Sequence, residues 1–377
     1  MQPEFMHLAL QLAKLAEGRT TPNPLVGAVI VKEGRVVGQG WHRKAGTAHA
    51  EIHALRQAGD LARGADIYVT LEPCSHRGRT GPCAKALAEA GVKRVFVAML
   101  DPNPLVAGKG LAYLRQAGIE VVEGVLAAEA ARQNIVFLKW ISTGLPFVSL
   151  KTAMSLDGKV AAKTGHSQWI TGSAARERVH HLRDCHDAIL TGIGTVLKDD
   201  PQLTTRLPQG GKNPLRVIVD SHAQTPLTAK VVCDDLAQTI IAVTEAAPPE
   251  RIEALRQAGV EVWLIKADTA GRIDLRALLQ QLGKAQISSL LLEGGSRLNA
   301  SFWADNLVDR VYWFIAPKVI GGDAAPGPIG GVGLERVPDM AELEEVEIEK
   351  IADDILISGD VSRREGRDVY RTCGRIR

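Results

Sequence analysis

The 377-residue sequence has few of the features that mark nucleic-acid-binding and membrane proteins. Aromatic residues make up only 4% of it, and 45 Lys and Arg against 43 Asp and Glu leave a net charge of +2. A nucleic-acid interface needs a basic groove with stacking aromatic rings, so we expect no nucleic-acid partner. We also expect no membrane partner, because no stretch of the chain approaches the roughly 20 apolar residues of a membrane-spanning helix.

Cysteine is scarce as well: the chain has five, an odd number. The first residues, MQPEF, show neither the basic segment nor the long apolar segment of a signal peptide. We therefore expect a cytoplasmic protein, in which closely spaced Cys and His residues indicate a metal site or catalysis before disulfides. Cys185, Cys233 and Cys373 have no obvious partners in the sequence and are interpreted as ordinary thiols.

The chain has enough apolar residues, 45%, for two domains, which its length also suggests. The turn at residues 142–146 is the predicted boundary, giving domains over 1–145 and 146–362. Residues 363–377 match neither domain and are a candidate for a disordered tail. In the first domain we expect helices over 5–18, 49–57, 83–90, 110–116 and 126–141, and strands over 25–31, 36–41, 67–71, 95–100 and 120–122.

The second domain repeats the alternation of strands and helices, which indicates a layered α/β fold. Its strands are mostly continuous Val, Ile and Leu runs, as in sheets covered on both faces. A long loop rich in glycine and proline follows over 321–333. The expected strands cover 147–152, 188–191, 215–220, 239–243, 260–265, 289–292 and 311–315.

Four residues of the first domain form a pattern typical of a catalytic zinc site: His49, Glu51, Cys74 and Cys83. One imidazole and two thiolates leave the fourth tetrahedral position open to water, whereas structural zinc sites are usually closed by four protein ligands. His76 is an alternative fourth ligand. Zinc lowers the pKa of bound water towards about 7, and Glu51 is interpreted as the residue that moves its proton.

Spacing constrains this site. Residues two apart in a helix face nearly opposite ways, so His49 and Glu51 can serve one metal only where His49 precedes the helix. Cys83 opens the next helix, whose N-terminus favours a thiolate. Zinc deaminases commonly space their cysteines C-x-x-C, but here eight residues, 75–82, separate them. This loop is polar and basic, and we interpret it as a recognition loop whose arginines suit a phosphate.

Together, the motifs at residues 21–27, 40–42, 49–51 and 72–83 resemble the bifunctional deaminase–reductases of riboflavin biosynthesis. The resemblance covers nearly the whole chain. One departure is Gly81, where the family usually has proline, and we expect no functional cost from it. The resemblance implies a cytidine-deaminase-like three-layer α/β/α domain, whose pocket is lined by Asn23, His42, His76, Arg79, Asp101 and Asn103. Each of these could instead be a turn or capping residue.

In the second domain, the strand over 289–293 leads through glycines into a helix at 297 or 298, and the strand over 188–191 leads into a similar turn at 192–196. Such turns can seat a phosphate, although most bind nothing and neither is a full G-x-G-x-x-G motif. Segments 151–159, 167–171, 191–201 and 293–295 resemble the family's NADPH-dependent, dihydrofolate-reductase-like half. This implies cofactor contacts from Ala153, Trp169, Thr195, Asp199, Ser221, Gly295, Ser296, Arg297, Leu298, Asn299, Ala300 and Ser301, and substrate contacts from Lys151, Ser167, Arg183, Leu203, Arg206 and Glu293.

Several of these roles agree with the chemistry of the side chains. Arg183 and Arg206 could clamp a substrate 5′-phosphate bidentately. Glu293, at the carboxyl end of a strand, lies where α/β sheets place ligands and could pair with the opened sugar or its amine. Lys151 is a candidate proton donor, or else part of a surface salt bridge. Asp199 contacts the cofactor or merely ends a helix.

The sequence therefore predicts a two-step enzyme with one Zn²⁺ per chain and NADPH. The expected substrate is a small phosphoribosyl-aminopyrimidine, which is deaminated before its ribosyl group is reduced to ribityl. We expect a homo-oligomer, a dimer or a tetramer. A nucleoside or nucleic-acid deaminase with an unrelated second domain would require the basic, aromatic surface that the composition lacks. A zinc-stabilised binding module would not require Glu51.

Overall fold

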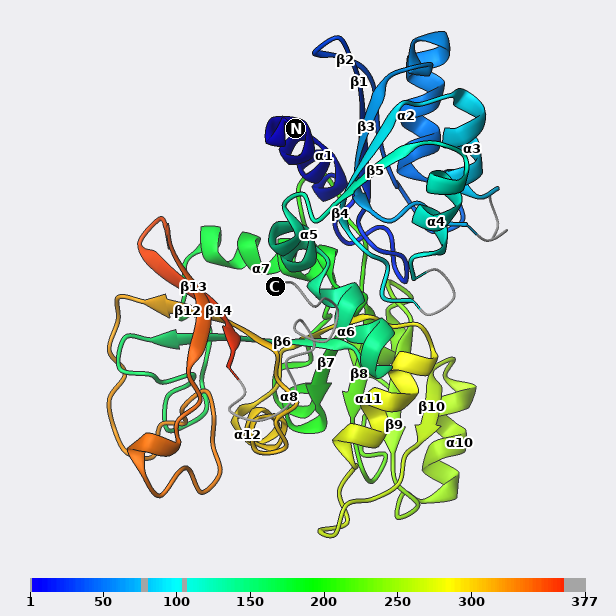
Figure 1. The fold of residues 1–377 in the computed structure, drawn as a ribbon. Helices are drawn as coiled ribbons and strands as arrows, with labels where there is room; N and C mark the ends of the chain where they lie inside the picture. Colours follow the sequence, from blue (N-terminus) through cyan, green and yellow to red (C-terminus); the bar gives the residue numbers. More distant parts are fainter. Residues whose placement is uncertain (1, 76–80, 104–106, 363–377) are drawn as a thin grey trace. The chain divides into compact units, whose positions relative to one another are not determined.

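The structure is a computed structural model that describes residues 2–75, 81–103 and 107–362. The chain divides into two compact units, the first ending at Leu145 and the second beginning at Pro146 (Figure 1). Each unit has its own sheet, and none of the described strands is shared between the two. The predicted tail lies outside the described residues.

The first unit is built on a five-stranded mixed sheet with the strand order β2-β1-β3-β4-β5. β1 is antiparallel to both β2 and β3, whereas β3, β4 and β5 run parallel to one another. The parallel strands all end at the same edge of the sheet, where the segments that follow them come together. The strands are β1 (Gly27–Lys32), β2 (Arg35–Trp41), β3 (Asp66–Leu71), β4 (Arg94–Met99) and β5 (Glu120–Glu123).

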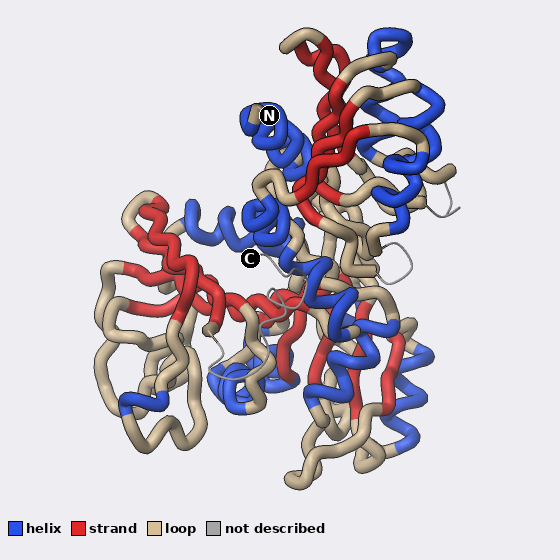
Figure 2. The backbone as a smooth tube through the Cα atoms, viewed as in Figure 1, coloured by secondary structure: helices blue, strands red, loops and turns tan. Residues whose placement is uncertain are grey.

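Helices cover both faces of this sheet, which makes three layers (Figures 1 and 2). Alternate residues of each buried strand feed two separate cores. Ala28 and Ile30 pack with α2, α3 and α4, while Val29 and Val31 pack with α1 and α5. These helices are α1 (Pro3–Lys14), α2 (Ala50–Ala58), α3 (Cys83–Ala90), α4 (Lys109–Gln116) and α5 (Ala127–Gln133), with a short 3₁₀ helix over Gly59–Ala62.

The prediction of one long helix over 126–141 is wrong. Two helices, α5 and α6 (Ile135–Thr143), meet at Asn134, which lies outside helical geometry. The buried Asn134 side chain accepts a hydrogen bond from the Leu25 backbone N–H at 2.8 Å and donates one to the Leu25 carbonyl at 3.0 Å. Because Leu25 is 109 residues away, helical periodicity alone could not reveal this contact.

The second unit is built on a nine-stranded sheet with the order β10-β9-β8-β7-β11-β6-β12-β14-β13. The seven strands from β10 to β12 are parallel, and β14 and β13 extend the sheet antiparallel. The strands are β6 (Phe147–Ser155), β7 (Ala188–Gly192), β8 (Leu215–Val219), β9 (Thr239–Val243), β10 (Glu261–Leu264), β11 (Ser289–Leu292), β12 (Arg310–Ala316), β13 (Leu343–Ile351) and β14 (Asp354–Val361).

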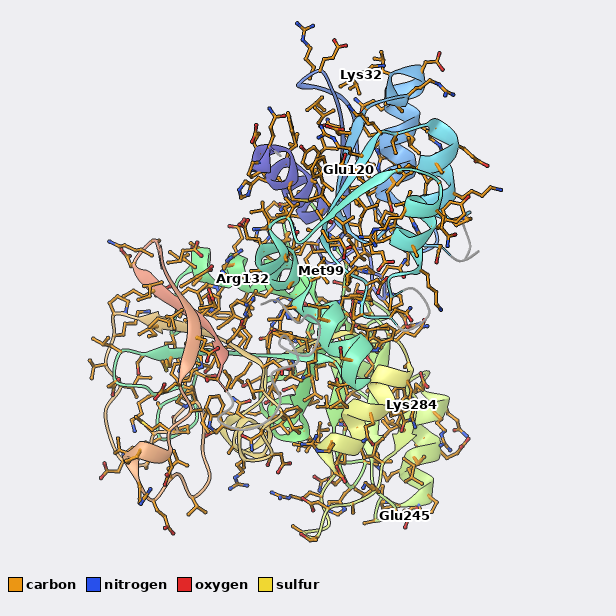
Figure 3. The ribbon with its side chains drawn as sticks, in the orientation of Figure 1. Lys32, Met99, Glu120, Arg132, Glu245 and Lys284 are labelled. Atoms are coloured by element: carbon orange, nitrogen blue, oxygen red, sulfur yellow. The ribbon has the colours of Figure 1, made fainter. Side chains whose placement is uncertain are left out.

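Helices pack on this sheet through two apolar clusters. One joins α8, α9 and α10 to strands β7 to β10, and the other joins α7 to β11, β12 and β14. Figure 3 shows charged residues such as Lys32 and Lys284 at the ends of elements. The helices are α7 (Ser173–Cys185), α8 (Ile193–Asp199), α9 (Lys230–Cys233), α10 (Pro249–Gln257), α11 (Leu275–Lys284) and α12 (Ser296–Ala304), with a short 3₁₀ helix over Val337–Asp339.

The strands predicted from apolar runs are confirmed, and their ends lie within two residues of the predicted ends. The exception is the strand predicted over 147–152, which continues to Ser155. The hairpin of β13 and β14 was missed. β13 is an edge strand whose residues are mostly exposed on both faces, so its sequence shows little of the apolar pattern that marks buried strands. Among the described residues, no helix is long and apolar enough to cross a membrane.

Candidate active sites

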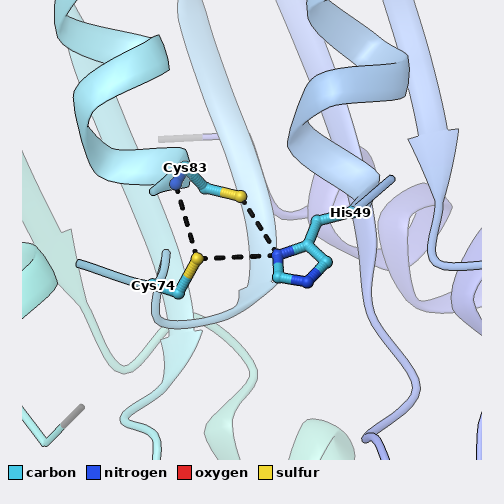
Figure 4. Close-up of side chains that lie close together, drawn as sticks. All are labelled: His49, Cys74 and Cys83. Atoms are coloured by element: carbon cyan, nitrogen blue, oxygen red, sulfur yellow. Dashed lines mark hydrogen bonds between the residues drawn. The ribbon is translucent and has the colours of Figure 1, made fainter. Parts of the chain in front are cut away.

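Three side chains of the first unit converge on one point (Figure 4). The ligand atoms of His49, Cys74 and Cys83 all lie within 4.8 Å of one another. The Nδ1 atom of His49 is 3.2 Å from the Cys83 sulfur and 3.5 Å from the Cys74 sulfur. One ring nitrogen and two thiols fit a zinc ion with a fourth position left for water.

Local structure explains the convergence. His49 is the N-cap of α2 with an extended backbone, as its shared role with Glu51 requires. Cys83 is the first residue of α3, and Cys74 follows the end of β3. The Cys83 backbone N–H donates to the Cys74 sulfur at 3.4 Å, and the Ala84 N–H donates to the Cys74 carbonyl at 3.1 Å. The α3 N-terminus thus holds both cysteines together.

The electrostatics of this cluster favour one thiolate and one proton-transferring carboxyl group, whereas the hydrogen bond to Cys74 and burial raise the pKa of the Cys83 thiol. Hydrogen bonding from Cys83, aided by His49, lowers the pKa of the Cys74 thiol to about 4, so a thiolate is available. Burial raises the pKa of Glu51, in the first turn of α2, to about 7. Its side chain is only 3% exposed. A carboxyl group with this pKa can both accept and release a proton at neutral pH.

The predicted pocket residues Asn23 and His42 lie beside this cluster. The His42 ring meets the His49 ring edge-on at 5.3 Å. His42 Nδ1 is 3.3 Å from the Ala48 carbonyl and its Nε2 is 3.0 Å from the Asn23 amide nitrogen. Burial lowers the pKa of His42, so the neutral ring donates from Nδ1 to the carbonyl and accepts from Asn23 at Nε2.

Two further predicted residues, Asp101 and Asn103, follow β4 at the same edge of the sheet. The Asp101 carboxylate accepts the Asn103 backbone N–H at 2.9 Å. The Asp101 N–H faces the carboxylate of Glu72, which sequence reasoning did not single out. His76 and Arg79 lie outside the described residues, so the recognition loop stays a prediction.

In the second unit, strand register brings three charged side chains together. Leu292 of β11 pairs with Leu150 of β6, so Glu293 and Lys151 emerge side by side. The Lys151 Nζ is 3.3 Å from a Glu293 oxygen. Arg183 from α7 donates to both Glu293 oxygens, at 2.7 and 3.0 Å. All three side chains are 11–15% exposed, so this is no surface salt bridge.

The two cations of this triad keep Glu293 ionised. Burial by itself raises the pKa of Glu293, but the charges of Arg183 and Lys151 outweigh burial and hold it well below the ordinary value. Arg183 also donates to the Thr204 carbonyl at 3.0 Å. Its guanidinium is therefore committed to protein partners, whereas the guanidinium of the exposed Arg206 has one hydrogen bond within the described part of the chain, to the Thr204 hydroxyl.

Sequence reasoning missed His180, which lies one helical turn before Arg183 on α7. Its Nδ1 accepts the Arg206 backbone N–H at 3.3 Å. Burial, together with the charges of Arg183 and Arg206, lowers the pKa of His180 to about 4, so it is neutral at physiological pH. The i, i+3 spacing of His180 and Arg183 was the available signal.

One cavity of about 1,810 Å³ contains every predicted cofactor and reductase substrate residue in its lining. Single-ligand pockets are commonly about 300–1,000 Å³, so this cavity has room for two molecules. The turns after β7 and β11 are part of its lining. A Cβ at Gly294 would lie 2.6 Å from the Asn299 side-chain oxygen, so a larger residue here would require Asn299 to move. Asp199 is the last residue of α8 and also lines the cavity, so both of its expected roles remain.

Comparison with known proteins agrees with this architecture. Residues 146–357 match the family described as RibD C-terminal domain, and residues 1–99 match the cytidine and deoxycytidylate deaminase zinc-binding region. The riboflavin biosynthesis protein RibD of Bacillus amyloliquefaciens is 45% identical over 372 residues, covering 98% of this chain and 100% of its own length. The RibD of Escherichia coli is 44% identical over 370 residues, covering 95% and 99%.

Solved structures show the same likeness. Acinetobacter baumannii RibD is 41% identical with a TM-score of 0.87, over 96% of this chain and 99% of its own. The diaminohydroxyphosphoribosylaminopyrimidine deaminase/5-amino-6-(5-phosphoribosylamino)uracil reductase of Thermotoga maritima is 37% identical with a TM-score of 0.83, over 96% and 98%.

A deaminase zinc-binding region followed by a reductase domain defines the class: a bifunctional deaminase–reductase. Within that class, the chain belongs to the RibD family of riboflavin biosynthesis. The predicted family, the α/β fold with a deaminase-like and a reductase domain, the dual enzymatic activity and the cofactors zinc and NADPH are confirmed.

Proposed function

We propose that residues 1–145 hydrolyse the 2-amino group of 2,5-diamino-6-ribosylamino-4(3H)-pyrimidinone 5′-phosphate. Residues 146–362 then reduce the ribosyl group of the product to ribityl with NADPH. The observation that carries this assignment is that each unit contains a different arrangement of reactive side chains. A three-donor metal cluster with a buried glutamate lies in the first unit, and an ion triad lies in a two-ligand cavity in the second.

In the deaminase step, His49, Cys74 and Cys83 would hold the zinc ion. Zinc, when bound, acts as a Lewis acid that lowers the pKa of water to about 7. Glu51 is proposed to take one proton from water as its oxygen adds to the ring carbon, and to pass that proton to the ring nitrogen. It then takes the second proton from the added oxygen and gives it to the amine, so that the C–N bond breaks, ammonia leaves and the carbonyl forms. Its raised pKa suits both directions of transfer. Asn23, His42, Asp101 and Asn103, with His76 and Arg79, are proposed to orient the pyrimidine and its phosphate.

In the reductase step, NADPH supplies a hydride when bound. Glu293 is ionised and therefore cannot donate a proton; it holds Lys151 and Arg183 in place. We propose that Lys151 Nζ carries the proton that the reduced centre requires. Arg206 is proposed as the main phosphate contact, because Arg183 is committed to Glu293 and Thr204.

The cofactor is proposed to lie along the turns at the carboxyl ends of β7, β8 and β11, where α/β sheets place ligands. The α12 N-terminus follows Gly295, which has no side chain to cap it, and helix N-termini direct backbone N–H groups at phosphates such as a pyrophosphate. The remaining proposed substrate contacts are Ser167 and Leu203, and the remaining proposed cofactor contacts are Ala153, Trp169, Thr195, Asp199, Ser221 and Ser296 to Ser301.

Separate assays of Glu51→Gln and Glu293→Ala test the assignment. We expect Glu51→Gln to reduce ammonia release by about 10²–10⁴-fold, because it removes general acid–base catalysis. NADPH oxidation on deaminated substrate should stay at the wild-type rate. Glu293→Ala should show the reverse. Glu89→Gln, on the exposed side of α3, is the matched control and should change neither reaction. Normal deamination by Glu51→Gln would refute the proposed first step.

We also infer a cytoplasmic location and a homo-oligomeric state, a dimer or a tetramer. The location is supported by the free cysteines of the described residues, because the cytosol keeps thiols reduced whereas oxidising compartments favour disulfides. Measuring the molar mass in solution tests the oligomeric state, and a monomeric mass would refute it.

A further inference from the structure

A buried carboxylate that no role above uses lies next to the zinc ligands. Glu72 follows the last residue of β3 and is 3% exposed. Among the described residues it forms no ion pair with a cation. A buried carboxylate without a cation is costly unless hydrogen bonds compensate for the lost water, so its partners are informative.

Three backbone N–H groups surround Glu72. One carboxylate oxygen accepts the Gly110 N–H at 2.9 Å. The other accepts the Gly108 N–H at 2.9 Å and faces the Asp101 N–H at 3.4 Å. Gly108 is the N-cap of α4 and has no side chain to cap that helix. Glu72 therefore supplies the missing cap from another element, at the positive end of the helix dipole.

The same contact brings α4 against the loop that carries a zinc ligand. A Cβ at Gly110 would lie 1.9 Å from the Pro73 carbonyl oxygen, so only glycine permits this approach. Pro73 immediately precedes Cys74. The Glu72 backbone N–H is itself fixed, since it donates to the Met99 carbonyl at 3.0 Å. Glu72 thus joins the end of β3 to the segment that follows β4.

We propose that Glu72 is a positioning residue of the deaminase site. Its carboxylate tethers the Asp101 backbone and the α4 N-terminus to the end of β3, and so keeps Asp101 and Asn103 beside Pro73 and Cys74. This inference rests on the proposed function of the first unit. It assigns the residue a role in substrate binding, through Asp101, that is separate from zinc binding.

Glu72→Gln tests the tether, because it keeps the size of the side chain and turns one acceptor oxygen into a donor facing donors. We expect kcat/KM for deamination to fall by about tenfold or more, mainly through KM, since small displacements of positioning residues have large effects. Zinc should stay at one per chain, and NADPH oxidation should be unchanged. Glu72→Asp keeps the negative charge at the α4 N-terminus, although its shorter side chain cannot reach all three N–H groups. We expect it to show a smaller rise in KM and a higher melting temperature than Glu72→Gln.

Asp66→Asn is the matched control. Asp66 begins the same strand that Glu72 follows, and its carboxylate pairs with Arg94. Asp66→Asn should lower the melting temperature without changing KM. In the double variant Glu72→Gln/Asp101→Ala, we expect KM to stay within about twofold of Asp101→Ala alone, because coupled residues are non-additive.

A wild-type KM for zinc-loaded Glu72→Gln would overturn the inference, and so would fully multiplicative effects of the two substitutions. A rise in KM that Asp66→Asn reproduces would also overturn it, because destabilisation alone would then explain the effect. If the wild type itself releases no ammonia, the proposed function fails instead.

Discussion

At the residue scale, two buried glutamates have opposite pKa shifts because their neighbours differ. Among the described side chains only the His49 ring opposes burial with positive charge at Glu51, and burial prevails, so the pKa of Glu51 in the metal-free chain rises to about 7. Glu293 is nearly as enclosed, with 11% of its side chain exposed, but Arg183 and Lys151 hold its pKa well below the ordinary value. One glutamate can therefore exchange protons at neutral pH, while the other stays ionised and organises cations. The residue type alone does not distinguish these roles.

His180 provides a pH-dependent prediction at this scale. Its pKa is about 4 in the folded chain against an ordinary 6.5, so between these pH values the unfolded chain binds more protons. The stability of the second unit should therefore fall as the pH drops from 6.5 to 4. His180→Gln keeps an acceptor for the Arg206 N–H and cannot titrate, so it should lose this part of the pH dependence.

Urea unfolding at several pH values measures the effect. His166→Gln, at an exposed histidine, is the control and should retain the wild-type pH dependence. Identical slopes for His180→Gln and the wild type between pH 6.5 and 4 would contradict the prediction.

At the element scale, close backbone packing places the metal ligands. β2 carries glycine at positions 38 and 40, two residues apart and so on one face. A Cβ at Gly40 would lie 2.5 Å from the His53 Cβ and 2.6 Å from the Ala50 carbonyl oxygen. These glycines let α2 approach the sheet, and the N-terminus of α2 carries His49 and Glu51.

Gly40→Ala should therefore displace the first turn of α2. We expect it to destabilise the first unit by about 1–3 kcal/mol, as overpacking does, and to lower both zinc occupancy and ammonia release. Gln39→Ala, at the exposed position next to it, should do neither. Metal analysis with thermal unfolding measures both effects, and full zinc occupancy with unchanged stability in Gly40→Ala would refute the explanation.

Some helices and strands were predicted correctly from the sequence and others were not. Buried strands and the α3 boundaries were found because apolar runs and capping residues are local signals. The division between α5 and α6 and the edge strand β13 were missed. The break between α5 and α6 coincides with the hydrogen bond between Asn134 and Leu25, a distant contact that local sequence does not reveal. β13 is mostly exposed, so it lacks the periodic apolar pattern of a buried strand.

At the scale of the whole molecule, two sheets with separate cores hold two separate ligand sites. A ligand that binds only the folded state stabilises it by about 2.7 kcal/mol at a hundred times its Kd. Zinc chelation should therefore lower the unfolding temperature of the first unit only, and saturating NADPH should raise that of the second only, by several degrees.

Differential scanning calorimetry measures both shifts, and limited proteolysis assigns each transition to its unit. NADH, added at the same concentration, shows how much of the shift depends on the 2′-phosphate. A single transition that both treatments move together would show that the two units unfold as one.

The sequence by itself determined the family and the positions of most strands along the chain, and it singled out His49, Cys74 and Cys83 as candidate zinc ligands with Glu51 beside them, because these depend on residue identity and on spacing. Tertiary structure alone decided that Arg183 is bound to Glu293, that His180 is neutral and that Glu72 caps a helix 38 residues later. Each of these depends on which distant groups share a water-poor environment. Strand register and close backbone packing set those neighbours, and neither can be read from local pattern.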